Sequence, residues 1–459
     1  MSTRGEHLVR ADRGFVTGGG MLARLIAPAF ARVLDDIDRH LACGRIETTL
    51  PDGSKRSLGS HAGGPTAIVR LSSWLSLVRL ATSGSVGWYK AWTLGEWSSP
   101  DPVTVFQVFS ANAATLGEIG RAKGPFRWVN ALAHRLRDNA PRKARANISA
   151  HYDLGNDFYA AWLDSTMTYS SARFASADES LEKAQLRKIK SLLDRLDLKP
   201  GDRLLEIGCG WGTLATEAAR RGVAVVGLTL SKEQKDWAER NIAEEGLIDR
   251  IEIRLQDYRQ TAEQFDAVAS VEMVEAVGRR WWGAYLCSIA RNLKPGGRAA
   301  LQFISIDHCL FERYAHNADF IQTYIFPGGM LLDEPQFESL ARERGLSWDD
   351  RQGFGRDYAE TLKRWRHRYD EAVARGALKG FADPFHALWR YYLMYCEGGF
   401  RGGAIDVAQV TMTKCGTVSK GGRVSSAGAS SLSRAHPCSA QGQRCTEQYE
   451  LLEGPWPGV

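Results

Sequence analysis

Residues 203–213, with the sequence RLLEIGCGWGT, limit the folds open to this chain more than any other stretch. The apolar run Leu204, Leu205 and Ile207 breaks into three glycines at every second position, which predicts a buried strand that ends in a tight turn. Such glycines let a ligand approach the backbone closely. The helix predicted to follow offers unpaired N–H groups at its start. The stretch therefore predicts a nucleotide-type pocket at the carboxyl end of a first strand.

The glycine spacing favours one class of nucleotide. A dinucleotide fingerprint needs its third glycine at the sixth place, where this chain has Thr213. The glycines fall instead at Gly208, Gly210 and Gly212, and Glu206 precedes them. Glu-x-Gly-x-Gly-x-Gly resembles motif I of the class I S-adenosylmethionine (SAM) methyltransferases. This resemblance implies that Glu206 serves the amino-acid end of SAM; from spacing alone, a turn without a ligand stays an alternative.

Strand and helix patterns alternate after this turn. We predict strands at 203–208, 223–230, 251–255, 266–271 and 298–304, and helices at 211–221, 232–244 and 281–293. This order predicts an α/β fold with a doubly wound parallel sheet. Strands near 346–351 and 406–413 would complete the seven-stranded, Rossmann-like sheet of a class I methyltransferase. Hairpin and helix patterns earlier in the chain predict a smaller N-terminal α+β domain.

The composition of the chain limits which binding partners are expected. The 459 residues suffice for two domains, and the net charge of +6 fits an anionic surface, either membrane or nucleic acid, or merely solvated basic faces. Without an apolar run of about 20 residues, no membrane span is predicted, so membrane contact would be peripheral. Eight cysteines lack the spacing of a metal site, and no metal is predicted.

We divide the chain into five segments. They are a flexible N-terminus (1–20), an accessory, lipid-binding domain (21–120), a basic amphipathic connector (121–150), a SAM-dependent catalytic domain (151–414) and a disordered tail (415–459). The connector could lie on an anionic bilayer or be a solvated linker. Four aromatic residues in the accessory segment form either a small core or a lipid-facing groove: Trp88, Tyr89, Trp92 and Trp97.

Several longer motifs occur in one order along the chain. They begin with HYDLGNDFY from residue 151, MTYSS from 167, GLTLSKEQ from 227, EMVEAVG from 272, FIQTYIFPGG from 320 and YYLMYC from 391. Together with motif I they resemble the cyclopropane-fatty-acyl-phospholipid synthase family, closely over 145–413 and loosely over 60–145. The resemblance implies SAM-dependent formation of cyclopropane from the double bonds of unsaturated phospholipid acyl chains. It also implies a cytoplasmic enzyme at the inner face of the membrane, a homodimer as one candidate assembly, and no nucleic-acid partner.

The resemblance assigns further SAM contacts to three segments. These are Tyr169 and Ser170, then Thr229, Leu230 and Gln234, and finally Asp257 and Tyr258. The first pair would close over the methionine end and the last would hold the adenine. From the residues alone, Ser231 and Gln234 have the spacing of a helix capping box.

Methyl transfer to a carbon–carbon double bond creates a carbocation, which needs a dry pocket with negative charge or π electrons and a base. In the family the base is a bound bicarbonate. Its ligands correspond to Ser171, Glu275, Gln302, Tyr358 and the backbone at Ile304. The family usually has Cys and His where this chain has Ser171 and Gln302, which leaves bicarbonate binding, and with it ring closure, open.

Two alternatives follow from these departures. The chain could methylate the acyl chain without ring closure, leaving a methylene or methyl branch, or it could be a lipid-binding homologue without catalysis. Cys396 matches a suspected active-site position in the family, although a small buried thiol is the plainer interpretation. Glu275 could likewise be a simple helix cap.

Overall fold

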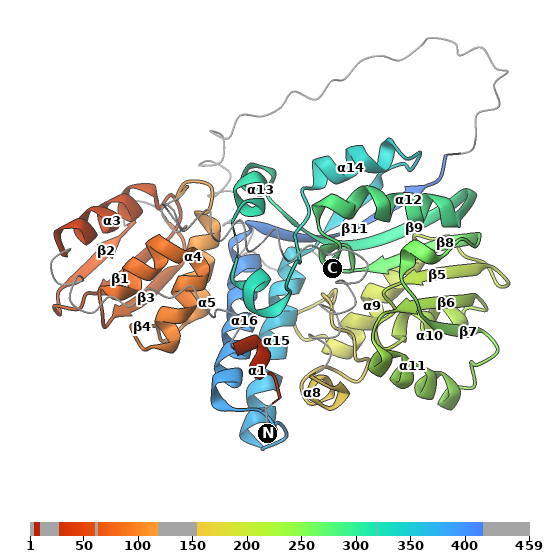
Figure 1. The fold of residues 1–459 in the computed structure, drawn as a ribbon, viewed down its shortest axis with the longest axis horizontal. Coiled ribbons are helices and arrows are strands. Elements are labelled where there is room, and N and C mark those ends of the chain that lie inside the picture. Colours follow the sequence, from red (N-terminus) through yellow and green to blue (C-terminus); the bar gives the residue numbers. More distant parts are fainter. Residues whose placement is uncertain (1–3, 10–26, 60–62, 118–153, 318, 416–459) are drawn as a thin grey trace, which may run out of the picture.

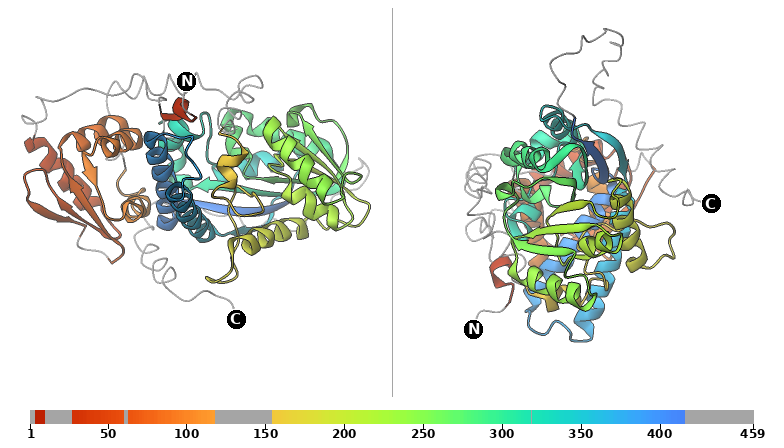
Figure 2. Two further views of the ribbon diagram at one scale, coloured as in Figure 1. Left: turned by 90° about the horizontal axis from the view of Figure 1, so that it is seen from below. Right: turned by 90° about the vertical axis from the view of Figure 1, so that its right-hand side faces the viewer.

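The computed structural model describes residues 4–9, 27–59, 63–117, 154–317 and 319–415. This part of the chain contains a four-stranded and a seven-stranded sheet. The two sheets lie at opposite ends of the molecule with two long helices, α15 (Gly355–Ala374) and α16 (Asp383–Gly402), between them (Figures 1 and 2). The predicted connector (121–150) and nearly all of the predicted tail, from residue 416 onward, lie outside the described residues.

The N-terminal sheet has the order β2-β1-β3-β4. Its strands are β1 (Arg45–Thr49), β2 (Lys55–Leu58), β3 (Thr66–Leu71) and β4 (Trp97–Ser98), and its helices are α3 (Ala27–His40), α4 (Leu75–Thr93) and α5 (Pro102–Ala111). The predicted smaller α+β fold is confirmed. Helix α4 continues through a kink at Gly84 (φ 57°, ψ −137°) into the aromatic stretch. Trp88 and Trp97 stack 4.4 Å apart and are buried, so both belong to a core.

The larger sheet has the order β10-β11-β9-β8-β5-β6-β7. Its strands are β5 (Arg203–Ile207), β6 (Ala224–Thr229), β7 (Ile251–Leu255), β8 (Phe265–Val271), β9 (Leu293–Ile306), β10 (Asp349–Gly353) and β11 (Ile405–Thr413). Strands β5 to β9 are parallel, and β11 runs antiparallel to both β9 and β10. The predicted doubly wound class I methyltransferase sheet is therefore confirmed.

Helices cover both faces of this sheet because each turns one apolar stripe toward it. Helices α9 (Leu181–Asp194), α10 (Thr213–Arg220) and α11 (Lys232–Glu244) bury their stripes in the core on one face. Helices α12 (Trp282–Asn292) and α14 (Glu334–Arg342) cover the other face. Short helices complete the connections: α8 (Asn156–Ala160), η1 (Tyr258–Gln260), η2 (Val274–Ala276) and η3 (Arg279–Trp281).

Two insertions extend beyond the sheet. The first follows β9 and contains α13 (His308–Ala315) and a π-helical turn, Ile321–Ile325. The second lies between β10 and β11 and consists of α15 and α16. Asp319, just before the π-helical turn, accepts hydrogen bonds from Ser85 of α4 (2.7 Å) and from Tyr395 of α16 (2.8 Å). The insertions thus connect the N-terminal part to the larger sheet.

Part of the predicted flexible N-terminus is packed against the catalytic part. Residues Glu6–Val9 form the short helix α1, in which Leu8 is buried. Arg4 forms a bidentate ion pair with Asp157 at 2.7 and 2.8 Å. The prediction for 1–20 was therefore wrong for residues 4–9. Across the described residues, no helix is both long and apolar enough to cross a bilayer.

Helix α5 packs directly along α16, as Figure 1 shows. Two glycines of α16 allow this approach. A Cβ added at Gly398 would lie 2.6 Å from the backbone oxygen of Val103, and one at Gly402 would lie 2.6 Å from that of Gln107. Both contacts involve backbone, so no side-chain rotation relieves them.

We expect Gly398→Ala to lower the free energy of unfolding by ~1–3 kcal/mol, the usual effect of overpacking. Gly399→Ala is the matched control, because its Cβ would meet only the end of the Ile405 side chain, at 3.1 Å. In the control the helix propensity of Ala makes the change neutral or mildly favourable. Thermal unfolding of both variants measures the difference; equal stability of the two would contradict the role given to Gly398.

Candidate active site

A cavity of about 610 Å³ opens at the carboxyl ends of β5, β6, β8 and β9. Most of the residues predicted for the site line it: Tyr169, Ser170, Glu206, Gly208, Gly210, Thr229, Leu230, Gln234, Asp257, Tyr258, Glu275, Tyr358 and Cys396. Of the predicted site residues, Ser171, Gly212 and Gln302 lie off the cavity wall. The fold therefore gathers into one place residues that are almost 230 positions apart in sequence.

The turn after β5 has the backbone that its glycines predict. Gly208, Gly210 and Gly212 all have positive φ values, of 83°, 53° and 92°. A Cβ at Gly208 would come within 2.8 Å of the Met273 side chain, so glycine keeps this part of the wall open. Gly212 instead precedes α10, where a Cβ would press on Ala238 of α11 at 3.0 Å. Gly212 thus lets α10 and α11 pack closely and lies off the cavity wall, and its assignment as a ligand contact stays a prediction.

Glu206 places a carboxylate in the cavity wall at the end of β5. The residue is buried, and its Oε2 has no hydrogen-bond partner among the described residues. Burial raises the pKa of Glu206 to about 8. A buried, unsatisfied carboxyl group is costly unless a ligand pairs with it. This residue and the open glycine turn fit the ammonium end of SAM, as the sequence predicted.

Lys188 is a member of the site that sequence reasoning missed. It lies on α9, is fully buried, and its Nζ donates a hydrogen bond to Ser170 Oγ at 2.6 Å. Burial lowers the pKa of Lys188 to about 8, while the carboxylates Glu272, Asp164 and Glu206 act in the opposite direction. A signal for it was present, because Lys188 follows Ala184 on the buried stripe of the helix.

The turn after β6 both caps helix α11 and contributes side chains to the cavity wall. Ser231 Oγ caps α11 by accepting a hydrogen bond from the backbone N–H of Gln234 at 3.2 Å, so the predicted cap is confirmed. Thr229 Oγ1 donates to Gln234 Oε1 at 2.9 Å. This bond orients both side chains at the cavity wall beside Leu230.

In the segment after β7, the predicted cofactor contact Asp257 already has a partner within the chain. The Asp257 carboxylate accepts hydrogen bonds from the Arg259 guanidinium at 2.6 and 2.8 Å. That guanidinium also lies 5.3 Å from the centre of the Tyr258 ring. Both Asp257 and Tyr258 line the cavity, and the Tyr258 ring packs edge-on against Tyr285. The segment offers an aromatic surface suited to a purine, with the carboxylate held by its own arginine.

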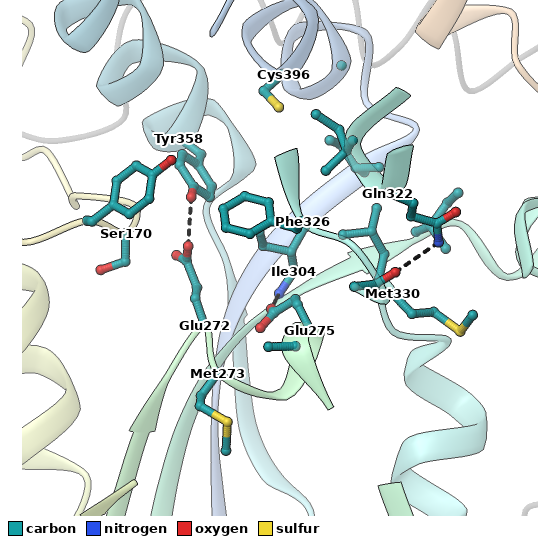
Figure 3. A pocket seen from close by; sticks show the side chains of 18 of the residues that line it. Ser170, Glu272, Met273, Glu275, Ile304, Gln322, Phe326, Met330, Tyr358 and Cys396 are labelled. Carbon is teal, nitrogen blue, oxygen red and sulfur yellow. Dashed lines mark hydrogen bonds between the residues drawn. The ribbon is translucent and has the colours of Figure 1, made fainter. Parts of the chain in front are cut away.

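The predicted bicarbonate ligands do meet, but around a carboxylate of the chain itself. Glu272 Oε1 accepts hydrogen bonds from the backbone N–H of Ser171 (2.9 Å) and from Gln302 Nε2 (2.8 Å). Glu272 Oε2 accepts one from the Tyr358 hydroxyl at 2.7 Å (Figure 3). Since these donors are engaged, and a second anion beside Glu272 would be repelled, the residues present do not fit bicarbonate.

Glu275 lies beside this group and is bound differently. Its Oε1 accepts a hydrogen bond from the backbone N–H of Ile304, while its Oε2 has no partner among the described residues (Figure 3). Burial and the neighbouring Glu272 carboxylate raise the pKa of Glu275 to about 8. Both effects disfavour the charged form of this carboxyl group.

Aromatic rings and one thiol form the wall next to the two glutamates. The Tyr358 and Phe400 rings lie 4.5 Å apart, and the Tyr169 and Tyr392 hydroxyls are 2.8 Å apart. Cys396 lines the same wall, and burial raises the pKa of its thiol. It stays protonated and is no candidate for a thiolate nucleophile. The structure places Cys396 in the cavity wall, and a catalytic role for it stays a prediction.

The far end of the cavity is built by the N-terminal part of the chain. Side chains from α4, α5 and the turn after α5 line it: Leu80, Trp88, Phe106, Phe109 and Leu116. These surfaces are apolar, whereas the end near β5 and β6 carries the polar groups. One cavity therefore joins a polar nucleotide end to an apolar end shared between the two parts of the chain.

Comparison with known proteins agrees with this geometry. The family model described as mycolic acid cyclopropane synthetase matches residues 139–410, more than half of the chain. The chain belongs to the mycolic acid cyclopropane synthetase family. This confirms the resemblance seen in the sequence, and the chain is accordingly a SAM-dependent methyltransferase.

Individual members of the cyclopropane synthetase family are similar over most of their length. The chain is 38% identical over 350 residues to the tuberculostearic acid methyltransferase UfaA1 of Mycobacterium tuberculosis, covering 74% of this chain and 81% of that protein. It is 35% identical over 358 residues to the cyclopropane-fatty-acyl-phospholipid synthase of Escherichia coli, covering 77% and 89%. The crystal structure of the mycolic acid cyclopropane synthase CmaA1 complexed with SAH and CTAB superposes with a TM-score of 0.55 at 33% identity, covering 59% of this chain and 98% of that one.

We expect Glu206→Gln to weaken SAM binding by ~10- to 100-fold, because a hydrogen bond to a charged group contributes about 1.5–3 kcal/mol. Isothermal titration with SAM measures the change. Glu217→Gln on α10 is the control, since Glu217 pairs only with Arg220 among the described residues. Unchanged affinity in the Glu206 variant would remove this carboxylate from the SAM site.

Proposed function

We propose that this chain transfers a methyl group from SAM to a double bond of an unsaturated phospholipid acyl chain and closes it to a cyclopropane ring. The observation that carries the proposal is the single cavity that runs from Glu206 to the apolar end lined by α4 and α5. A soluble, polar acceptor would not need that end. An extended hydrocarbon chain would gain about 0.8 kcal/mol for each methylene that it buries there.

The residues between the two ends have the properties that the reaction requires. SAM, when bound, supplies an electrophilic methyl carbon on a sulfonium leaving group. Glu206 holds the ligand's ammonium end, and the apolar walls exclude water from the double bond. The negative charge near Glu272 and the faces of Tyr358 and Phe400 stabilise the carbocation that forms on the acyl chain.

A branched product is the second candidate. Specific observations favour it: Glu272 takes the place predicted for bicarbonate, and a similar protein is named a tuberculostearic acid methyltransferase. In this case loss of a proton from the acyl chain after methyl transfer leaves a methyl branch beside a new double bond. A methylene branch results if a hydride first shifts to the cationic carbon and the proton then leaves the added methyl group. Both products share the same first step.

We place the enzyme at the inner face of the membrane as a peripheral protein of the cytoplasm. The net charge of +6 supports attraction to anionic lipid head groups. So do the basic residues of the predicted connector, 121–150. The E. coli relative is named for phospholipid as its substrate. A homodimer remains a prediction.

The test is an assay of the product. Purified protein is incubated with SAM and vesicles of a monounsaturated phospholipid, and the released fatty acids are analysed by mass spectrometry. The expected result is a gain of one CH2 group in a product that resists reagents specific for alkenes. A product of the same mass that reacts as an alkene would favour the branched chain. No lipid product, together with methylation of a soluble amine, would contradict the proposal.

The apolar end gives a second prediction. Ala113→Trp fills the cavity wall near Leu116 and should displace at least two methylenes of the acyl chain, lowering kcat/KM for lipid about tenfold. SAM affinity should be unchanged, because Glu206 lies at the other end. Ala114→Trp is the matched control, since Ala114 is equally half-buried but lies off the cavity wall. Equal lipid kinetics for the two variants would exclude this end as the acyl site.

A further inference from the structure

Glu272 has an unfavourable backbone conformation for its residue type. It directly follows β8 and has a φ of 47°, in the left-handed region that favours glycine. Its side chain points into the cavity between Ser170 and Glu275 (Figure 3). Strain of this kind persists where the surroundings hold the residue firmly, and it often accompanies function.

The surroundings of Glu272 are built to hold an anion. Three donors from separate segments converge on its two oxygens: the Ser171 backbone N–H, Gln302 Nε2 and the Tyr358 hydroxyl. The orientation of the Gln302 amide is set from behind, because its Oε1 accepts a hydrogen bond from Gln409 Nε2 at 3.1 Å. Ser171 and Gln302 lie off the cavity wall, so the Glu272 carboxylate stands between them and any substrate.

The hydrogen bonds to Glu272 and the Lys188 ammonium favour the charged form of its carboxyl group. Burial raises its pKa, but the bonds from Tyr358, Ser171 and Gln302 and the Lys188 ammonium oppose the rise. Glu275 has one bond from a backbone N–H, and burial raises its pKa to about 8. Of the two neighbouring carboxyl groups, Glu272 accepts three hydrogen bonds and Glu275 accepts one, so the hydrogen bonds favour the charged form at Glu272.

We infer that the Glu272 carboxylate is the built-in catalytic base of this enzyme and makes it independent of bicarbonate. The inference rests on the proposed function and deepens it. In the first step the alkene π pair forms a bond to the methyl carbon, and the carbon–sulfur pair leaves with the sulfur. In the second step Glu272 takes one proton from the substrate cation.

The electrons of the broken C–H bond decide the product. If the proton comes from the added methyl group, those electrons close the cyclopropane ring. If it comes from the acyl chain, they form a new double bond beside the branch. In both cases the product is neutral, and the proton on Glu272 passes to water after the product leaves.

The test compares the wild type with two variants and one control in buffer freed of carbon dioxide. We expect the wild-type rate on lipid vesicles to be the same with and without added bicarbonate. Glu272→Gln keeps the shape of the side chain but cannot carry the charge or take the proton, so kcat should fall ~100-fold or more while SAM affinity is retained. Glu338→Gln on α14, a half-buried residue paired with Arg342 and away from the cavity wall, should leave kcat unchanged.

The second variant, Glu272→Gly, relieves the strained φ and frees the three donors. It should bind 13C-labelled bicarbonate, detected by NMR, and recover activity when bicarbonate is added, whereas the wild type should bind none. Binding of bicarbonate by the wild type, or a wild-type rate that depends on it, would overturn the inference. So would normal turnover of Glu272→Gln, or a Glu272→Gly variant that binds SAM but neither binds nor responds to bicarbonate.

The bicarbonate-binding measurement also distinguishes a failure of the proposed function from a failure of the inference about Glu272. It needs no lipid, so a wild type that is inactive on unsaturated phospholipid would contradict the proposed function while the NMR result still decides on Glu272. An active wild type whose Glu272→Gln variant is equally active would contradict the base and leave the function in place.

Discussion

The structure depends on keeping a small group of charges inside an apolar cavity. Lys188, Glu206, Glu272 and Glu275 lie within one wall, and Lys188 is fully buried. Charges in such surroundings interact more strongly than in water, and a charge without a partner is expensive. The hydrogen bonds to Glu272 and from Lys188 reduce the free-energy cost of burying these charges. The remaining unsatisfied atoms, Oε2 of Glu206 and Oε2 of Glu275, face a place where ligands bind.

Two parts of the chain enclose the cavity. The parallel sheet supplies the polar end, because the carboxyl ends of β5, β6 and β8 converge there. The apolar end exists only because α5 lies against α16, and that contact requires glycine at 398 and 402. Dispersion forces favour such close packing, but a single extra methyl group would push the helices apart. The contact between α5 and α16 therefore both stabilises the interface and closes the cavity.

Much of the fold could be predicted because its signals are local. The alternation of apolar strands and amphipathic helices from 203 to 304 has periods of two and 3.6 residues, which neighbouring residues alone define. The motif around Gly208 and the cap at Ser231 depend on contacts within five positions of the chain. The path of α4 was harder to predict. Its kink lies at Gly84, and the next residue, Ser85, is bonded to Asp319, which is 234 positions away in the chain.

The candidate site likewise has features that the sequence predicts and features that only the tertiary structure decides. The sequence by itself determined the sheet and the glycine turn with Glu206, since these follow from short-range patterns. Its resemblance to a family indicated most, but not all, of the residues that line the cavity. Only the tertiary structure decided what those residues do to one another. The donors at 171, 302 and 358 are far apart in the chain, and no spacing rule shows that all three bind the carboxylate of Glu272. A hydrogen bond depends on a distance of about 3 Å in space, and that distance exists only after the strands, the insertions and the N-terminal helices have packed together.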